Sequence, residues 1–177
     1  MAEKDRNGNA PVQGGDSPEQ NFGMRIAKDG TWYHQGSPIG RKPLVKLFAS
    51  VLRRDDAGDY WLVTPVERGR IEVEDAPFMA VELTVEGQGT DQDITFRTNV
   101  DDLVVADKAH PLRIVHDPAT GEPAPYILVR DRLEARLARS VYYHLADLCV
   151  ERRVGGRSVL GVWSGGAFFI LEDEEIS

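Results

Sequence analysis

Apolar and polar positions alternate along much of the chain, and this two-residue period predicts β-strands. The clearest case is "FMAVELTVEG", which would place Met79, Val81, Leu83 and Val85 on one face of a strand. The run "DITFRT" follows as its predicted hairpin partner, with "GQGTDQ" as the connecting loop. The runs "DLVVAD", "PLRIVH" and "PYILV", separated by turns rich in Asp, Gly and Pro, predict three more strands.

Hairpins are predicted at both ends of the chain. The segment "MRIAKDGTWYHQGSPI" is typical of two strands with turns at residues 29–30 and 35–36. The run "YWLVT" predicts a strand that Pro65 ends. Near the end of the chain, "VLGVWSGGAFFIL" predicts a hairpin over residues 159–171, with Ser164-Gly165-Gly166 as its turn.

Two segments change to the helical period. Residues 42–53 begin with Pro43, which suits a first helical turn, and form one apolar face. That face consists of Leu44, Leu47, Phe48, Val51 and Leu52. Residues 131–150 predict a longer helix that Gly155 and Gly156 close. Its predicted buried stripe consists of Leu133, Leu137, Val141, Leu145 and Leu148, with Cys149 beside them as a small core residue.

The order of these elements predicts an α+β fold of two small subdomains with antiparallel sheets. A helix precedes a strand at 42–53 and 60–64, and again at 131–150 and 159–171, so a repeated strand/helix motif is expected. The predicted organisation is a disordered, polar tail at residues 1–21, an N-terminal subdomain at 22–100 and a C-terminal subdomain at 101–177. The boundary is expected near residues 99–102.

Composition narrows the classes of function. The chain has 177 residues, a formal net charge of −8 and a pI near 5.0, which disfavours general binding to nucleic acid or anionic lipid. It contains no apolar run of about 18 residues and no apolar leader, so we expect a cytoplasmic protein that does not insert into membranes. Its one cysteine excludes an internal disulfide and a cysteine-based metal site, and the four histidines show no metal-binding spacing. We expect neither a metal nor a cofactor.

Candidate binding residues gather in "GTWYHQGSPIGRKP". Trp32 and His34 share a strand face, and Arg41 stands just before the helix that Pro43 begins. An aromatic ring, an imidazole and a cation beside a helix N-terminus would suit a planar or anionic ligand. In the alternative interpretation Trp32 covers the core and His34 binds a local carbonyl.

Carboxylates follow in "EVEDAP". Glu74 and Asp75 could form the far wall of a ligand site, or one of them could pair with Arg41. A hydrolase that uses His34 with Asp75 or Glu74 is a weaker alternative, because paired acid–base groups need burial that the sequence does not show. The other interpretation places Glu72 and Glu74 on the solvated face of a strand.

Other motifs in the sequence give weaker indications of function. Seven arginines against four acids between residues 130 and 157 predict either an anion-binding face or the solvated side of a helix. The run "GVWSGG" lacks the first glycine of a nucleophile elbow and turns between two strands, so Ser164 is not expected to be a nucleophile. No enzyme motif emerges, and no catalytic residue is assigned.

Four stretches carry a family resemblance: "GTWYHQGSPIGRKPLVKLFASVL", "DYWLVTPVER", "VEDAPFMAVEL" and "GVWSGGAFFIL". They resemble the bacterial family known as domain of unknown function 1285 (DUF1285), over residues 22–171. The resemblance implies a two-part α+β fold built from repeated motifs, with a second half superficially similar to pleckstrin-homology-like (PH-like) domains. It also implies a small-molecule site between the halves and a role in signalling. Because a hairpin follows the predicted long helix here, phosphoinositide binding is not carried over.

We therefore expect a ligand-binding or signalling module. Its site, between the two subdomains, would consist of Trp32, His34, Arg41, Glu74 and Asp75. A protein-interaction scaffold is the main alternative, since short sheets with exposed edges pair with partners. The partner is then an unidentified small molecule or protein.

Overall fold

The computed structural model describes residues 20–173; residues 1–19 and 174–177 lie outside the described part. The tail predicted at residues 1–21 falls outside it, except that β1 begins at Gln20. The elements in chain order are β1 (Gln20–Ile26), β2 (Trp32–His34), β3 (Ser37–Pro38), α1 (Lys42–Ser50), β4 (Leu52–Arg54), β5 (Tyr60–Val63), β6 (Arg68–Val73), β7 (Phe78–Glu86), the 3-10 turn η1 (Gly89–Asp91), β8 (Asp93–Thr98), β9 (Leu103–Val105), β10 (Leu112–His116), β11 (Pro123–Arg130), β12 (Leu133–Leu137), α2 (Arg139–Asp147), β13 (Val150–Val154), β14 (Arg157–Ser164) and β15 (Ala167–Asp173).

Two six-stranded sheets with the same topology make up most of the molecule. The strand order of the first is β3-β2-β1-β6-β5-β4, and that of the second, read from its β9 edge, is β9-β8-β7-β12-β11-β10. In each sheet two antiparallel meanders join where the first and last strands pair in parallel, β1 with β6 and β7 with β12. The topological repeat is therefore β1–β6 and β7–β12, and not the helix–strand units that the sequence predicts.

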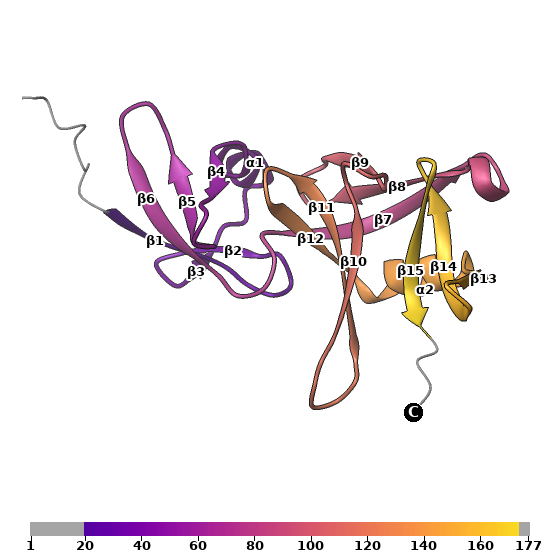
Figure 1. Cartoon of the computed structure of the whole chain (residues 1–177). Helices are drawn as coiled ribbons and strands as arrows, with labels where there is room; N and C mark the ends of the chain where they lie inside the picture. The colour runs from indigo at the N-terminus through magenta and orange to yellow at the C-terminus, as the bar shows by residue number, and fades with distance from the viewer. Residues whose placement is uncertain (1–19, 174–177) are drawn as a thin grey trace, which may run out of the picture.

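The division between the sheets differs from the predicted boundary. The chain leaves the first sheet at Val73 and enters the second at Phe78, well before residues 99–102. Because β7 and β8 pair with each other and β7 also pairs with β12, residues 78–98 belong to the second sheet. Figure 1 shows the first sheet, the second sheet and the terminal hairpins following one another along the long axis of the molecule.

The fold is mainly β, so the predicted α+β class with antiparallel sheets is only partly correct. The helix predicted at 131–150 is wrong at both ends: residues 133–137 form β12, α2 covers only Arg139–Asp147, and Val150 begins β13. Asp131 and Arg132 have positive φ angles and form the two-residue turn between β11 and β12. Gly155 and Gly156 do not end a helix but form the turn between β13 and β14.

The first helix lies where the sequence predicts it but is shorter, since Leu52 already belongs to β4. Ala49 is its buried residue, whereas Leu47, predicted on the apolar face, is exposed. In β7 a bulge between Ala80 and Glu82 shifts the alternation. Leu83 is buried, but Val81, predicted on the same face, is turned to solvent.

A third sheet, β13-β14-β15, completes the fold. Its β14–β15 hairpin confirms the one predicted over residues 159–171. Buried Ser164, before the turn, accepts a 2.8 Å hydrogen bond at Oγ from the backbone N–H of Ile94 on β8. Gln92 donates from Nε2 to the carbonyl of Trp163, so the third sheet is anchored to the second. Of the helices within residues 20–173, none is long and apolar enough to cross a membrane.

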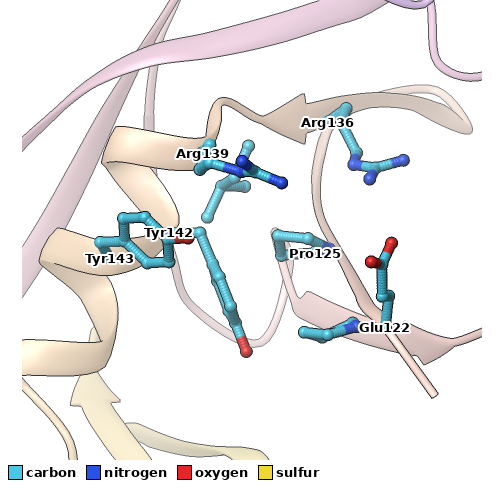
Figure 2. Close-up of a pocket in the computed structure, with 8 residues that line it drawn as sticks. Glu122, Pro125, Arg136, Arg139, Tyr142 and Tyr143 are labelled. Carbon is cyan, nitrogen blue, oxygen red and sulfur yellow. The ribbon is translucent and has the colours of Figure 1, made fainter. Parts of the chain in front are cut away.

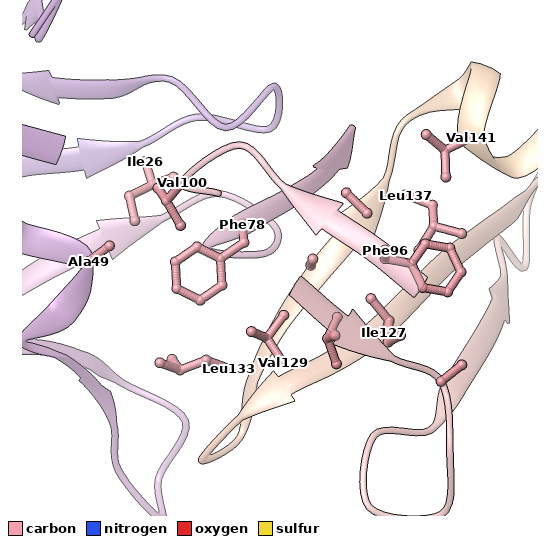
Figure 3. Close-up of a cluster of buried hydrophobic side chains, with 14 of the residues drawn as sticks. Ile26, Ala49, Phe78, Phe96, Val100, Ile127, Val129, Leu133, Leu137 and Val141 are labelled. Carbon is pink, nitrogen blue, oxygen red and sulfur yellow. The ribbon is translucent and has the colours of Figure 1, made fainter. Parts of the chain in front are cut away.

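One contiguous core runs through both six-stranded sheets. Ile26 and Ala49 contribute from the first sheet and α1, and Leu137 of β12 and Val141 of α2 lie at the other end (Figure 3). Phe78 lies between them as the first residue of the second sheet. Burial of such continuous apolar surface is what holds the two sheets together.

Candidate functional site

The five residues predicted as one site are not brought together. Trp32 is 1 % exposed and stacks on Phe48 of α1 at 6.3 Å between ring centroids. This agrees with the alternative interpretation of Trp32 as a core residue. Its indole Nε1–H is buried and has no hydrogen-bond partner among the described residues. Because Trp32→Ala would open a large core cavity, that variant cannot report on ligand binding alone.

Glu74 faces the opposite side of the first sheet from Trp32. Its Oε1 lies 2.5 Å from Arg25 Nη1, and its Oε2 accepts from the backbone N–H of Lys28. Arg25 in turn lies over Tyr33, the residue that alternates with Trp32 along β2. Glu74 therefore forms a local ion pair with Arg25 at the start of the linker between the two sheets.

His34 and Arg41 are both exposed, at the end of β2 and before α1. Within residues 20–173, His34 forms no hydrogen bond with Glu74 or Asp75, because those carboxylates bind Arg25, Tyr126 and Arg136 instead. The geometry thus gives no support to the acid–base arrangement proposed from the sequence.

Asp75 is the one predicted residue that lies in a cluster joining the two sheets. It follows β6, and its Oδ1 accepts a 2.6 Å hydrogen bond from the phenol of Tyr126 on β11. Its Oδ2 lies 2.8 Å from Nη1 of Arg136 on β12. Burial raises the pKa of the Tyr126 phenol, and the bond to Asp75 raises it further, so the phenol stays a neutral donor at pH 7.

A second arginine, Arg113, also contacts Tyr126 in this cluster. Arg113 on β10 lies 4.7 Å from the centroid of the Tyr126 ring and forms two hydrogen bonds with Glu134. Tyr126 therefore lies between the guanidinium groups of Arg113 and Arg136. This arrangement fixes Arg136, whose side chain also borders a cavity.

The cavity has a volume of about 290 Å³ and lies between the β10–β11 hairpin, β12 and the start of α2. Its lining is formed by Glu122, Pro123, Pro125, Arg136, Leu137, Arg139, Tyr142 and Tyr143. Figure 2 shows Arg136 and Arg139 on one side, with Glu122 and Pro125 on the other and the Glu122 carboxylate directed toward Arg136. Three charged side chains and two tyrosines thus share the lining with two prolines and a leucine, so this pocket is more polar than most small-molecule pockets.

Positive charge in this cavity is only partly neutralised. Within residues 20–173, Arg139 forms no hydrogen bond or ion pair, and it is the first residue of α2. The helix has no side-chain cap, so its first N–H groups add partial positive charge there. Burial raises the pKa of Tyr142, which keeps that phenol neutral.

Sequence reasoning missed this site because it placed Arg136 and Arg139 on a single long helix. In the structure Arg136 is on a strand and Arg139 on a helix, and both side chains line the same cavity at the corner between the two elements. The local excess of arginine between residues 130 and 157 was the sequence feature that could have indicated this site. In the described chain, residues 20–173, no group of three or more His, Cys, Asp and Glu side chains is arranged to hold a metal ion.

Family models match nearly all of this chain. The N-terminal domain of DUF1285, a domain of unknown function, matches residues 10–76, and the C-terminal domain of the same family matches residues 77–171. These limits coincide with the division between the two six-stranded sheets. No curated protein matches the chain.

Two solved structures are similar. A DUF1285 family protein from Silicibacter pomeroyi DSS-3 is 46% identical over 97% of this chain and 91% of that chain, with a TM-score of 0.81. A DUF1285 family protein from Shewanella baltica OS155 is 26% identical over 71% of this chain and 91% of that chain, with a TM-score of 0.55. With both of its domains matched in order, the chain belongs to the DUF1285 family.

Proposed function

We propose that this protein is a binding module for a small organic anion, held in the cavity at the start of α2. The observation that carries the proposal is Arg139, an exposed cation at the cavity without an acidic partner in residues 20–173. A ligand carboxylate or phosphate would supply that partner, with the first N–H groups of α2 beside it. The volume of about 290 Å³ stands at the lower end for ligand pockets, so the ligand is small.

The walls define the rest of the ligand. Pro123, Pro125 and Leu137 present apolar surface, and Tyr142 adds an aromatic ring. A planar organic body that bears one acidic group can use both this apolar surface and the polar groups of the lining, which a free inorganic ion cannot. The proposal keeps the small-molecule function expected from the sequence but moves its site from Trp32 to Arg139.

We extend the proposal to a role in signalling through Arg136, which both lines the cavity and pairs with Asp75. A ligand that draws Arg136 toward itself competes with Asp75, which stands in the linker between the two sheets. Binding would then change how firmly the sheets are joined. The bacterial cytoplasm is the setting that this proposal assumes. The likeness of the second half to PH-like domains stays a prediction.

The test compares two arginines. Thermal unfolding of the wild-type protein would be followed with benzoate, phenyl phosphate and inorganic phosphate, and with benzamide as the uncharged control. An anion at about 100 times its dissociation constant adds about 2.7 kcal/mol to the free energy of unfolding, a shift of several degrees. The shift should disappear in Arg139→Ala and persist in Arg41→Ala, which removes another exposed arginine, from the site first predicted.

Either of two results would contradict the proposal. One is the absence of a shift with every anion in the wild-type protein. The other is a shift of equal size in Arg139→Ala. Loss of the shift in Arg41→Ala alone would return the site to the first sheet, where the sequence placed it.

A further inference from the structure

The outer edge strand of the third sheet, β13, is unusually exposed. All five residues of β13, Val150–Val154, are exposed. On one side β13 pairs with β14; on the other, no backbone hydrogen bond to another element is found among residues 20–173. The strand contains neither a proline nor a bulge, two devices that commonly block edge pairing.

The register of the β13–β14 hairpin shows which backbone groups are free. Val154 and Arg157 flank the two-residue turn formed by Gly155 and Gly156, both with positive φ. In such a hairpin the flanking pair exchanges hydrogen bonds, and every second pair after it does the same. Glu151 and Arg153 therefore direct their N–H and C=O groups away from β14, toward the open side.

The sequence of this edge is complementary to itself when reversed. If two copies of "VERRV" pair antiparallel about Arg152, Glu151 of one lies opposite Arg153 of the other, and Val150 lies opposite Val154. The pairs Glu151–Arg153 are then the hydrogen-bonded ones, as the free backbone groups require. Opposite charges directly across a strand pair stabilise it, and so do facing β-branched side chains.

Arg152 would face its own copy at the centre. Its guanidinium carbon lies 4.8 Å from the ring centroid of Trp163 and 5.1 Å from that of Phe168. The side chain is thus turned back over its own sheet and away from the edge. Glu151 accepts from Ser158 Oγ at Oε1, which leaves its Oε2 for a second partner.

We propose that β13 is a homodimerisation edge, at which a second copy of this chain adds its own β13 antiparallel about Arg152. The other edge strands are less suited to pairing with a second copy. The strands β3, β4 and β9 have only two or three residues each, and β10 and β15 lie against each other. An interface of this size is small, so the dimer exchanges with monomer. The inference is independent of the ligand cavity.

The test is analytical ultracentrifugation of the full chain from micromolar to millimolar concentration. The wild-type mass should rise from 19.7 kDa toward twice that value as the concentration increases. R153E places two acids opposite each other at both ends and should abolish the rise. The double variant E151R/R153E exchanges the two charges and should restore it.

Two proline variants, which remove backbone N–H groups, separate edge pairing from general charge effects. Arg153→Pro removes an N–H that faces outward, so it should abolish dimerisation while the hairpin stays intact. Arg152→Pro removes an N–H used by β14 and should lower the melting temperature. A mass of 19.7 kDa at all concentrations would overturn the proposal, and so would a dimer that R153E and Arg153→Pro leave unchanged.

Discussion

Asp75 and Arg136 tie the linker between the two six-stranded sheets to the second sheet through a 2.8 Å ion pair. The carboxylate is mostly buried, and its other oxygen binds the phenol of Tyr126, so a single side chain satisfies two donors from β11 and β12. This relationship places Arg136 beside the cavity. It also makes Asp75 a structural residue first, although the sequence presented it as a ligand contact.

We expect Asp75→Ala to lower the free energy of unfolding by about 1–3 kcal/mol, because it leaves partly buried donors of Tyr126 and Arg136 without an acceptor. Asp75→Asn keeps one carbonyl acceptor and should cost less. Urea unfolding at pH 7 measures both. The matched control is Glu86→Gln, an exposed carboxylate without a hydrogen bond in residues 20–173. Equal stability of Asp75→Ala and the wild type would contradict the assigned role.

Asp101 should make the junction between α1 and β8 sensitive to acid. A hydrogen bond from Lys42 lowers the pKa of Asp101, and the charges of Lys42 and Lys46 add to this effect. A carboxylate with a lowered pKa binds fewer protons in the folded chain than in the unfolded one. Its stabilising effect is therefore complete at neutral pH and is lost as the pH falls below about 4.

The measurement is the melting temperature of wild type and Asp101→Asn from pH 7 to pH 2. The variant should melt lower at pH 7, and the difference should shrink as the pH falls through the lowered pKa of Asp101. Because the pairs are exposed, salt at molar concentration should reduce the difference at pH 7 as well. A difference independent of pH would mean that the carboxylate charge is not its cause.

Gly161→Ala should be strongly destabilising. A Cβ atom at this position would lie 2.3 Å from the carbonyl oxygen of Phe169 on the neighbouring strand, and backbone cannot move aside as a side chain can. We expect a loss of about 1–3 kcal/mol. Gly40→Ala is the control, because its Cβ would meet nothing within 4 Å. Thermal unfolding should show a lower melting temperature for the first variant and little change for the second.

Leu83 and Val81 should respond differently to truncation, although strict alternation gives them the same face. Leu83→Ala removes a buried side chain and should cost about 2–5 kcal/mol. Val81→Ala changes an exposed residue at the bulge and should stay within about 0.5 kcal/mol of wild type. Chemical denaturation of the two variants provides the comparison, and similar losses would contradict the bulge.

The long helix shows why pattern alone misplaced an element. Leu133, Leu137, Val141 and Leu145 are spaced by four, and four is both an even number and close to one helical turn. The same spacing therefore suits a strand and a helix, and both occur: the first two residues are buried on β12 and the last two on α2. The turn at Asp131 and Arg132 lacks the glycine that usually announces a hairpin.

By itself the sequence determined most of the strands, the first helix, the hairpin turns at residues 29–30, 35–36 and 164–166, and the family, because these depend on local periodicity and on residues close in the chain. Only the tertiary structure decided the strand order and the division at residues 73–78, and only it shows the cavity on which the proposed site rests. The parallel pairs β1–β6 and β7–β12 join segments far apart in sequence, and local patterns carry no record of them. Contacts between distant segments also bury Trp32 in the core and place Arg139 at a cavity, and neither can be read from the local sequence pattern.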